Sequence, residues 1–358
     1  MTRGYVRSAV VVLPYRDEDD AAALANGTDN GLSAEVYSAD RDHAGRFARR
    51  LDCGQVKING VRTRIIRMSP SAAPSSRLRA RAGCSRAGRD DRGDGGDVMM
   101  DTRTVLVTGT AAGIGAALAQ TLADSGHAVI GLDRVPCDIA GAEAMVCDLA
   151  DADAIDAAIA ALPGTVDAIA SVAGIPGTHP PTRVLAVNLL APRRLITGVL
   201  PRVRPGGAVV TVASVAAHRN VVPPAGITAL LAAQTSGDVD AWLGEYPLTG
   251  SQAYDTSKHA LVRWTQLLAA ELLPSGIRAL SVSPGPVETG ILTDFAATMG
   301  QAAIDRSAAA VGRHARPGEI AAVISFALSD AASWVNGIDI PVEGGLFAAR
   351  AATAGGTT

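Results

Sequence analysis

The sequence predicts an α/β fold in which one parallel sheet carries helices on both faces. From residue 102 onward, apolar runs of strand length alternate regularly with segments of helix length, which is typical of a doubly wound sheet. The first of these runs, at 104–108, leads directly into a glycine-rich loop and a helix. Apolar residues make up 48% of the chain and aromatic residues only 3%, so small aliphatic side chains have to fill the core. We therefore expect a Rossmann-like sheet of about seven strands.

The residues ahead of this domain predict a separate, smaller α/β piece. Over residues 1–66, strand patterns at 8–15, 32–38 and 55–59 alternate with helix patterns at 17–25 and 42–51. The next segment consists mainly of Ser, Pro, Ala, Gly and Arg, which leave little to bury, so it predicts a disordered linker. The predicted divisions are 1–66 for the small fragment, 67–98 for the linker, 99–350 for the main domain and 351–358 for a flexible tail.

Each element of the main domain is predicted from its own pattern. Short apolar runs rich in Val, Ile and Ala predict buried strands. Gly126 predicts the end of the first helix, and Pro317 predicts the start of the last one. The predicted strands cover 104–108, 128–132, 144–147, 166–172, 208–213, 277–282 and 338–342, and the predicted helices cover 114–125, 152–162, 185–203, 254–273 and 317–328.

Composition and charge argue against several kinds of partner. The formal net charge is −3, which gives no reason to expect nucleic acid or an anionic membrane. The chain has no stretch of about 18 uncharged apolar residues that would predict a membrane helix, and the apolar run at 8–13 is too short for a signal peptide. The four cysteines show neither metal-ligand spacing nor a disulfide framework. We expect a cytoplasmic protein without a metal site.

The glycine-rich loop predicts a dinucleotide site. Gly109, Gly113 and Gly115 lie between a predicted strand and a predicted helix. Glycines there let the chain turn and let a pyrophosphate approach the backbone N–H groups at the helix start. The spacing is Gly-x-x-x-Gly-x-Gly rather than Gly-x-Gly-x-x-Gly, so the loop alone is a weak signal.

An acidic residue at the end of the second predicted strand indicates which dinucleotide. Asp133 lies 18 residues beyond Gly115. A carboxylate at this place accepts hydrogen bonds from the ribose hydroxyls of the adenosine and repels a 2′-phosphate. Arg134 acts in the opposite direction, because a guanidinium binds phosphate well. The glycine loop itself supplies no cation, so NAD is favoured over NADP.

Tyr254 and Lys258 form a second candidate for chemistry. They are four residues apart, so on a helix the two side chains lie on one face. The chain holds only one other lysine, Lys57, and the choice of lysine here indicates a need for a compact ammonium. One interpretation is a proton-transfer pair in which Lys258 assists Tyr254. The alternative is an amphipathic helix whose tyrosine and lysine face solvent.

Together these motifs resemble the short-chain dehydrogenase/reductase family, over residues 104–347. The glycine loop, a serine after the fifth strand and the Tyr-x-x-x-Lys pair occur in the family's order. The family's Asn-Ala-Gly motif appears as Val172-Ala173-Gly174, a departure at its first position. The resemblance implies catalytic roles for Asn188, Ser214, Tyr254 and Lys258. It implies cofactor contacts by Gly109, Gly113, Ile114, Gly115, Asp133, Asp148, Leu149, Ala173, Gly174, Tyr254, Lys258, Pro284, Gly285, Val287 and Thr289.

The resemblance also implies a mechanism, in which hydride moves between a nicotinamide and a carbinol carbon while Tyr254 takes the alcohol proton. A free tyrosine has a pKa of about 10, which is mismatched to neutral pH. A cation about 4 Å away contributes on the order of 4 kcal/mol, or roughly three pKa units. Lys258, helped by an oxidised nicotinamide, is therefore expected to bring Tyr254 towards neutrality. Ser214 is expected to hydrogen-bond the substrate oxygen, and Asn188 to hold a water that connects Lys258 to solvent.

The spacing between Ser214 and Tyr254 is unusual for the family, at 40 residues. The inserted residues are predicted to form packed helices. The insertion resembles that of 3α-hydroxysteroid dehydrogenase/carbonyl reductases and coniferyl-alcohol dehydrogenases, with the closer likeness to the second group over 173–178 and 334–346. This branch implies a homodimer rather than the family's common tetramer. The residues expected in a loop over the substrate are Leu292, Phe295 and Met299.

Residues 4–60 resemble part of the C-terminal region of aldehyde dehydrogenases, through the runs at 13–20, 25–33 and 50–60. The cofactor domain and the nucleophilic cysteine segment of that family have no counterpart here, so an aldehyde dehydrogenase-like bifunctional protein is disfavoured. The predicted function is an NAD-dependent oxidoreductase that interconverts an alcohol and a carbonyl, with an aromatic, coniferyl-type alcohol as substrate. The alternatives are a 3α-hydroxysteroid dehydrogenase/carbonyl reductase and a non-catalytic nucleotide-binding scaffold.

Overall fold

The structure is a computed structural model of the chain. It describes residues 16–27, 34–38, 40–51, 56–58, 61–63, 102–290, 292, 294 and 301–354. The chain divides into two compact units, Met1–Gly93 and Asp94–Thr358, and this division falls within the predicted linker. The strand predicted at 8–15 and the linker predicted at 67–98 lie outside the described residues.

The first unit contains short helices and strands. Its strands form a small sheet in the order β1-β2-β3, with β1 parallel to β2 and β2 antiparallel to β3. Ala48, Leu51 and Val56 form its small core. Strand β3 has no counterpart in the sequence prediction. The elements are α1 (Glu18–Asn26), β1 (Ala34–Val36), α2 (Arg41–Ala48), β2 (Val56–Ile58) and β3 (Val61–Thr63).

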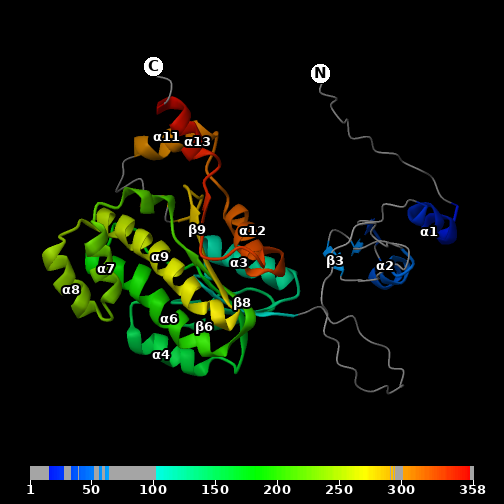
Figure 1. Cartoon of the computed structure of the whole chain (residues 1–358), viewed down its shortest axis with the longest axis horizontal. Helices are drawn as coiled ribbons and strands as arrows, with labels where there is room; N and C mark the ends of the chain where they lie inside the picture. The colour runs from blue at the N-terminus through cyan, green and yellow to red at the C-terminus, as the bar shows by residue number, and fades with distance from the viewer. Residues whose placement is uncertain are drawn as a thin grey trace, which may run out of the picture. The chain divides into compact units, whose positions relative to one another are not determined.

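The second unit contains one sheet of seven parallel strands, as the sequence predicts (Figure 1). The strand order is β10-β9-β8-β7-β4-β5-β6, so the order reverses between β4 and β7. Ligands of such sheets bind outside the carboxyl ends of the strands at this reversal. The strands are β4 (Thr104–Thr108), β5 (Ala128–Asp133), β6 (Ala142–Val146), β7 (Val166–Ser171), β8 (Val203–Val212), β9 (Arg278–Pro284) and β10 (Asp339–Val342).

Helices cover both faces of this sheet (Figure 1). Leu118 and Ile324 are fully buried in the apolar core of one face, and Leu195 and Ile196 in that of the other. Because both faces are covered, the central strands consist largely of buried apolar residues. The helices of the first face are α3 (Gly113–Asp124) and α12 (Pro317–Leu328), and those of the second are α4 (Ala152–Ala161), α6 (Ala191–Val199) and α9 (Gly250–Leu272).

The helix predicted at 185–203 begins earlier and is irregular. It starts at Pro181, where the ring of a proline suits the first helical turn. Strand β8 follows it directly at Val203. In the part of the chain that is described, 181–202 is also long and apolar enough to cross a membrane, but 56% of its most apolar window is buried inside the fold. Its parts are α5 (Pro181–Leu185), the π-helical turn η1 (Ala186–Leu190), α6 and the 3-10 turn η2 (Leu200–Arg202).

The inserted residues ahead of α9 form two packed helices, as predicted. These are α7 (Pro224–Ala232) and α8 (Ser236–Glu245). The indole N–H of Trp242 donates a hydrogen bond to the carbonyl of Gly226 at 2.9 Å. Its ring stacks on Tyr246 with 5.1 Å between the ring centroids. The hydrogen bond to Gly226 joins α8 to α7, and both helices contribute to the apolar cluster that also includes residues of α9 (Figure 1).

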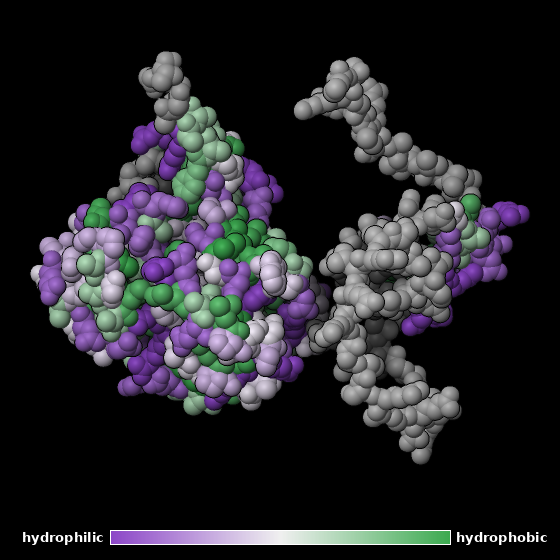
Figure 2. All heavy atoms as spheres, viewed as in Figure 1, coloured by the Kyte–Doolittle hydropathy of each residue, from purple (hydrophilic) through white to green (hydrophobic). Residues whose placement is uncertain are grey.

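Two further helices near the C-terminus have no counterpart in the sequence prediction. They are α11 (Gln301–Val311) and α13 (Leu346–Ala354). Helix α13 runs to Ala354, so it includes the first residues of the flexible tail predicted at 351–358. Figure 2 shows polar and apolar residues interspersed over the visible face of this unit. The remaining short helices are η3 (Val215–Arg219), η4 (Leu273–Ser275) and η5 (Asp330–Ala332).

Candidate active site

The glycine loop adopts a backbone that other residues rarely accept. Gly109 and Gly113 have φ angles of +78° and +62°, in the left-handed region that favours glycine. A Cβ on Gly115 would lie 2.0 Å from the carbonyl oxygen of Gly109. The chain therefore turns tightly between β4 and α3, and the first N–H groups of α3 border the turn. Such a helix start is favourable for a phosphate group.

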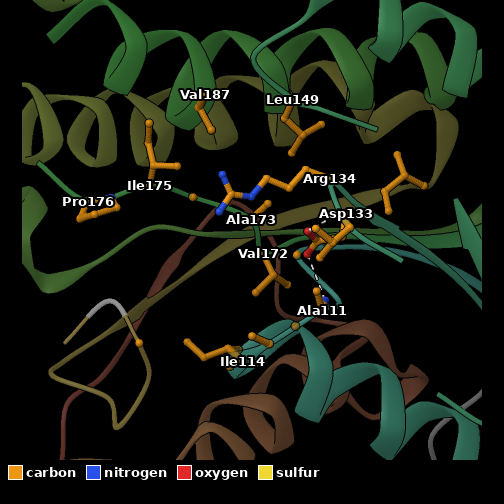
Figure 3. Close-up of a pocket in the computed structure, with 18 of the residues that line it drawn as sticks. Ala111, Ile114, Asp133, Arg134, Leu149, Val172, Ala173, Ile175, Pro176 and Val187 are labelled. Carbon is orange, nitrogen blue, oxygen red and sulfur yellow. Dashed lines mark hydrogen bonds between the residues drawn. The ribbon is translucent and has the colours of Figure 1, made fainter. Parts of the chain in front are cut away.

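A cavity of ≈ 590 Å³ opens in front of this loop. Figure 3 shows Ile114 pointing into it from one side and Leu149 and Val187 from the opposite side. The volume and the apolar walls are those of a site for a small molecule or cofactor. The predicted cofactor residues that line it are Gly109, Gly113, Ile114, Gly115, Asp133, Asp148, Leu149, Ala173, Gly174 and Thr289.

Asp133 ends β5 and faces the glycine loop. One oxygen of its carboxylate accepts a hydrogen bond from the backbone N–H of Ala111 at 3.0 Å, and the other accepts one from Val135 at 3.3 Å. The carboxylate therefore holds the loop as well as bordering the cavity. Arg134 is exposed, and Figure 3 shows its side chain reaching across the cavity towards Ala173.

These features fit a nicotinamide dinucleotide. The glycine loop leaves room for a pyrophosphate in a place that side chains would otherwise fill. Asp133 stands where a ribose would bind, and Leu149 and Val187 provide apolar walls for a flat ring. Asp148 borders the same cavity, and its carboxylate accepts a hydrogen bond from the N–H of Ala150 at 2.9 Å.

Tyr254 and Lys258 lie one turn apart near the start of α9. Thr249 and Gln252 begin the helix with a capping box, which fixes its first turn. Tyr254 is 9% exposed and Lys258 4%, so the alternative of a solvent-facing pair is wrong. The Nζ of Lys258 lies 5.8 Å from the centroid of the Tyr254 ring and donates a hydrogen bond to the carbonyl of Val212 at 2.9 Å.

Ser214 follows β8 and lies against Tyr254. It is the N-cap residue of η3, and its hydroxyl accepts a hydrogen bond from the backbone N–H of Ala216 at 3.1 Å. The Ser214 side chain is also hydrogen-bonded to Tyr254. The fold therefore brings these two residues together, although 40 positions separate them in the sequence.

Asn188 lies in the π-helical turn η1, an irregularity that is frequent at functional sites. Its amide clamps the backbone of Ile175: Oδ1 accepts from the N–H at 2.8 Å, and Nδ2 donates to the carbonyl at 2.9 Å. A Cβ on Gly174 would lie 3.2 Å from both Asn188 Oδ1 and Lys258 Nζ. Gly174 lines the cavity, so Lys258 and Asn188 lie directly behind this part of the cavity wall. The water-holding role of Asn188 stays a prediction.

Burial dominates the electrostatics of the tyrosine–lysine pair. It raises the pKa of Tyr254 to about 12, and the hydrogen bond to Ser214 offsets only part of this rise. Burial also lowers the pKa of Lys258 to about 8. Among the chain's own groups burial outweighs the nearby charges, because the phenolate loses more solvation than these charges return. The expectation that Lys258 and an oxidised nicotinamide together lower the pKa of Tyr254 stays a prediction.

Some predicted residues are not part of the cavity wall. Pro284 ends β9, Gly285 follows it, and Val287 is buried in the core. These three do not line the cavity, and neither do the predicted catalytic residues Asn188, Ser214, Tyr254 and Lys258. Thr289 does line it and lies beside Gly113, since a Cβ on that glycine would be 3.2 Å from the threonine methyl. Of the four residues predicted between 284 and 289, Thr289 is therefore the one that contributes to the cavity wall.

The structure adds cavity residues that sequence reasoning does not single out. His179 and Arg183 line the cavity from the segment that follows the Ala-Gly motif, and their positions match no motif. Val187 directly precedes the predicted catalytic residue Asn188, and this position could have identified it from the sequence as a residue of the site. In the described ranges, no group of three His, Cys, Asp or Glu residues is arranged to hold a metal ion. Of the residues predicted over the substrate, the described set includes Leu292 but neither Phe295 nor Met299.

Comparison with protein families gives three matches along the chain. Residues 103–229 match the short chain dehydrogenase family, and residues 241–347 match the family described as Enoyl-(Acyl carrier protein) reductase. Residues 8–72 match the aldehyde dehydrogenase family, which confirms the resemblance predicted for the N-terminal segment.

Individual relatives cover most of the second unit. The coniferyl-alcohol dehydrogenase of Pseudomonas sp. strain HR199 is 34% identical over 259 residues, which is 70% of this chain and 98% of the relative. The 3-alpha-hydroxysteroid dehydrogenase/carbonyl reductase of Comamonas testosteroni is 31% identical over 68% of this chain and 96% of its own. The 3-alpha-hydroxysteroid dehydrogenase of Pseudomonas sp. B-0831, solved with NADH, superposes with a TM-score of 0.61 at 31% identity, over 70% of this chain and 98% of that one. The chain therefore belongs to the short-chain dehydrogenase/reductase family of oxidoreductases.

Proposed function

We propose that the chain is an NAD-dependent alcohol dehydrogenase that interconverts an alcohol and a carbonyl, with an aromatic, coniferyl-type alcohol as substrate. The observation that carries the proposal is the position of Gly174, which lines the cavity and packs against Lys258 Nζ. Through this contact Lys258, with Tyr254 one helical turn away, lies directly behind the wall of a cavity that fits a dinucleotide.

Each side chain then has a role that follows from its chemistry. A nicotinamide held by the glycine loop, Ala173 and Thr289 would exchange a hydride with the carbinol carbon and would carry a positive charge when oxidised. Tyr254 takes the proton of the alcohol as a phenolate, and Ser214 donates a hydrogen bond to the same oxygen. The ammonium of Lys258 stabilises the phenolate one helical turn away. Asn188 holds the backbone that forms the wall of the cavity.

NAD is the proposed cofactor, rather than NADP. One support is the Asp133 carboxylate, which repels a 2′-phosphate. The other is the solved relative from Pseudomonas sp. B-0831, which is complexed with NADH. Arg134, which reaches across the same cavity, is the residue that would favour NADP.

The aromatic substrate rests on the likeness to the coniferyl-alcohol dehydrogenase. A hydroxysteroid is the second candidate, because two relatives with that activity in their names cover the same unit. The test is the formation of reduced cofactor across a panel of cinnamyl alcohols and 3α-hydroxysteroids, with NAD and NADP in parallel. The proposal predicts the highest kcat/KM with a cinnamyl alcohol and NAD. A higher value for a steroid favours the second candidate, and cofactor binding without turnover favours a nucleotide-binding scaffold.

We also propose that the chain acts in the cytoplasm as a homodimer, without nucleic acid or membrane as partner. Trp334 is 98% exposed, and Phe326 and Ile338 are 45% and 46% exposed. Large apolar side chains left exposed near one another in the sequence support contact with a second copy. Light scattering of the purified protein measures the mass that checks this.

A further inference from the structure

The insertion leaves the placement of Ser214 against Tyr254 to noncovalent contacts. Because the two residues are 40 positions apart, the chain itself hardly restrains the distance between their hydroxyls. Ser214 caps η3, and Tyr254 lies on α9. Contacts between η3 and α9 therefore have to fix this distance.

Two hydrogen-bonded pairs of side chains join the end of η3 to α9. Arg219 donates two hydrogen bonds to the carboxylate of Asp255, from Nε at 3.0 Å and from Nη2 at 2.7 Å. The hydroxyl of Thr256 donates one to Oδ1 of Asn220 at 2.9 Å. The neighbouring residues Arg219 and Asn220 thus bind the neighbouring residues Asp255 and Thr256.

The ion pair is the stronger of the two contacts. Its two-pronged geometry is the favourable one for arginine and carboxylate, and the Asp255 side chain is only 9% exposed. Asp255 directly follows Tyr254, and Arg219 ends the helix that Ser214 begins. One ion pair therefore spans the two segments that carry the hydroxyl groups.

We propose that the Arg219–Asp255 ion pair is a positioning device, which holds Ser214 at hydrogen-bonding distance from Tyr254 across the inserted helices and balances the charge beside the Tyr254 hydroxyl. The proposal rests on the proton-transfer role proposed for Tyr254. Both residues act through Ser214 and Tyr254 rather than on the substrate.

The two members of the pair act on Tyr254 in opposite directions. Beyond the larger effects of burial and of the bond to Ser214, the Asp255 carboxylate raises the pKa of Tyr254 and the Arg219 guanidinium lowers it. Lys258 is the cation near the Tyr254 ring on the same helix. Other titratable groups of α9 and of the described elements packed on it have other contacts. His218 contacts the ring of Phe347, and His259 lies against the carbonyl of Ala217 in η3. Arg204 pairs with Asp167, Arg278 donates to the carbonyl of Ala327 in α12, and Arg183 lines the cavity.

The test measures kcat against pH for alcohol oxidation by variants of the full chain, with the best alcohol of the panel. Asp255→Asn leaves the cation of Arg219 unbalanced, so the rise of kcat with pH moves about half a unit to one unit lower. Arg219→Gln leaves the carboxylate unbalanced, so the rise moves higher by a similar amount. Arg219→Lys keeps the charge but loses the two-pronged contact, so kcat falls about tenfold without a shift in pH.

The chain offers a matched control in the Arg194–Asp156 pair. It is also two-pronged, but its side chains are 42% and 52% exposed and it joins α6 to α4. Asp156→Asn is expected to leave kcat and its pH dependence unchanged. Combining Arg219→Gln with Asp255→Asn removes both charges, so the pH dependence returns to that of the wild type while kcat stays low. Asp255→Asn is nearly isosteric, which keeps the test decisive if Arg219→Gln does not fold.

Crystal structures of the variants give a readout that needs no turnover. In Arg219→Lys and Arg219→Gln, the hydroxyls of Ser214 and Tyr254 are expected to separate beyond hydrogen-bonding distance. The proposal is overturned if this hydrogen bond persists in both, or if the two variants of unbalanced charge shift the pH dependence in the same direction or not at all. If no alcohol is oxidised, the proposed function fails, and the crystal structures still decide whether the pair positions Ser214.

Discussion

Lys258 shows how burial and function compete within one side chain. Its ammonium is almost fully enclosed and donates to the carbonyl of Val212. Burial lowers the pKa of this group to about 8, because the charged form loses its water. An ionisable group kept at such a cost beside a cavity is typical of a functional site.

Lys258→Met is expected to abolish turnover and to change how stability depends on pH. The unfolded chain binds a proton at this lysine below pH 10.5, whereas the folded chain binds it only below about 8. Between these values the unfolded state holds more protons, so the free energy of unfolding of the wild type rises with pH, by up to about 1.4 kcal/mol per unit. The variant lacks this rise.

Urea unfolding at several pH values between 8 and 10 checks this prediction. The window ends at pH 10 because Tyr254, whose pKa is raised to about 12, has the opposite effect on stability above pH 10. Above that pH the unfolded chain loses the tyrosine proton while the folded chain keeps it, so the free energy of unfolding falls. If the free energies of unfolding of wild type and variant change in parallel with pH over this window, a buried Lys258 with a lowered pKa is contradicted.

Asp133→Asn is expected to move the cofactor preference towards NADP. The substitution removes the charge that repels a 2′-phosphate and leaves Arg134 to bind it. The ratio of kcat/KM with NADP to kcat/KM with NAD should rise about tenfold, which corresponds to about 1.4 kcal/mol. An asparagine oxygen can still accept the hydrogen bond from Ala111, so the melting temperature serves as the control for an intact loop. An unchanged ratio would remove Asp133 as the basis of the preference.

At the residue scale, the sequence predicts groups whose chemistry is written in a motif. The glycines of the loop could be predicted because only glycine accepts their backbone, and Asp133 because it ends a strand at a known distance from them. The hydrogen bond that Asp133 accepts from the N–H of Ala111 could not be predicted, since any backbone N–H of the loop could donate it. Arg219 and Asp255 carry no motif, and their pairing exists only after the insertion has folded.

At the element scale, the start of α9 packs backbone against backbone. A Cβ on Gly250 would lie 2.3 Å from the carbonyl oxygen of Gly177 and 2.5 Å from that of His179. The helix can therefore begin directly on the segment that follows the Ala-Gly motif, one turn ahead of Tyr254. The position of the tyrosine depends on this close approach.

Gly250→Ala is expected to destabilise the fold and to slow catalysis. Overpacking at a site bounded by backbone costs about 1–3 kcal/mol, and a displaced first turn moves Tyr254 relative to Ser214, so kcat should fall about tenfold. Gly244→Ala is the control, because nothing lies within 4 Å of a Cβ there; it should stabilise α8 by about 0.5–1 kcal/mol. Thermal unfolding and kcat measure both effects, and a Gly250→Ala protein with wild-type values would show that the approach is not critical.

Elements with a clear period or a clear stop could be predicted to within a few residues. The strands at 104–108 and 166–171 coincide closely with their apolar runs, since a buried parallel strand has no polar face. The helix that begins at Pro181 could not be located from periodicity, because its first turn is polar and its π turn breaks the period. Helix α13 could not be predicted either, as its alanine-rich sequence follows two glycines.

At the scale of the whole molecule, each unit has a core of its own. Ala48, Leu51 and Val56 form the core of the first unit, and residues from Val105 onward form the cores of the second. The alternation of strands and helices predicts a doubly wound parallel sheet, and the glycine loop after its first strand predicts where a dinucleotide binds, which is why the fold and the place of the cavity could be predicted. The shape of the inserted helices depends on packing between distant residues, and the alternation does not determine it.

A chain that starts at Met99 is expected to keep the kcat/KM and the melting temperature of the second unit. The physical reason is that every described residue of the cavity and of the Tyr254 site belongs to Asp94–Thr358. Differential scanning calorimetry and the alcohol assay on both chains make the comparison. A short chain that is inactive or unfolded would show that the N-terminal residues contribute to the enzyme.

The central claim is that Tyr254 transfers the proton of an alcohol beside a nicotinamide. The most direct measurement is NADH formation by Tyr254→Phe compared with the wild type, on the best alcohol of the panel, with NAD affinity measured by calorimetry. Losing the proton acceptor should lower kcat at least about a hundredfold while NAD affinity stays near the wild-type value. Turnover that survives the substitution unchanged would contradict the account.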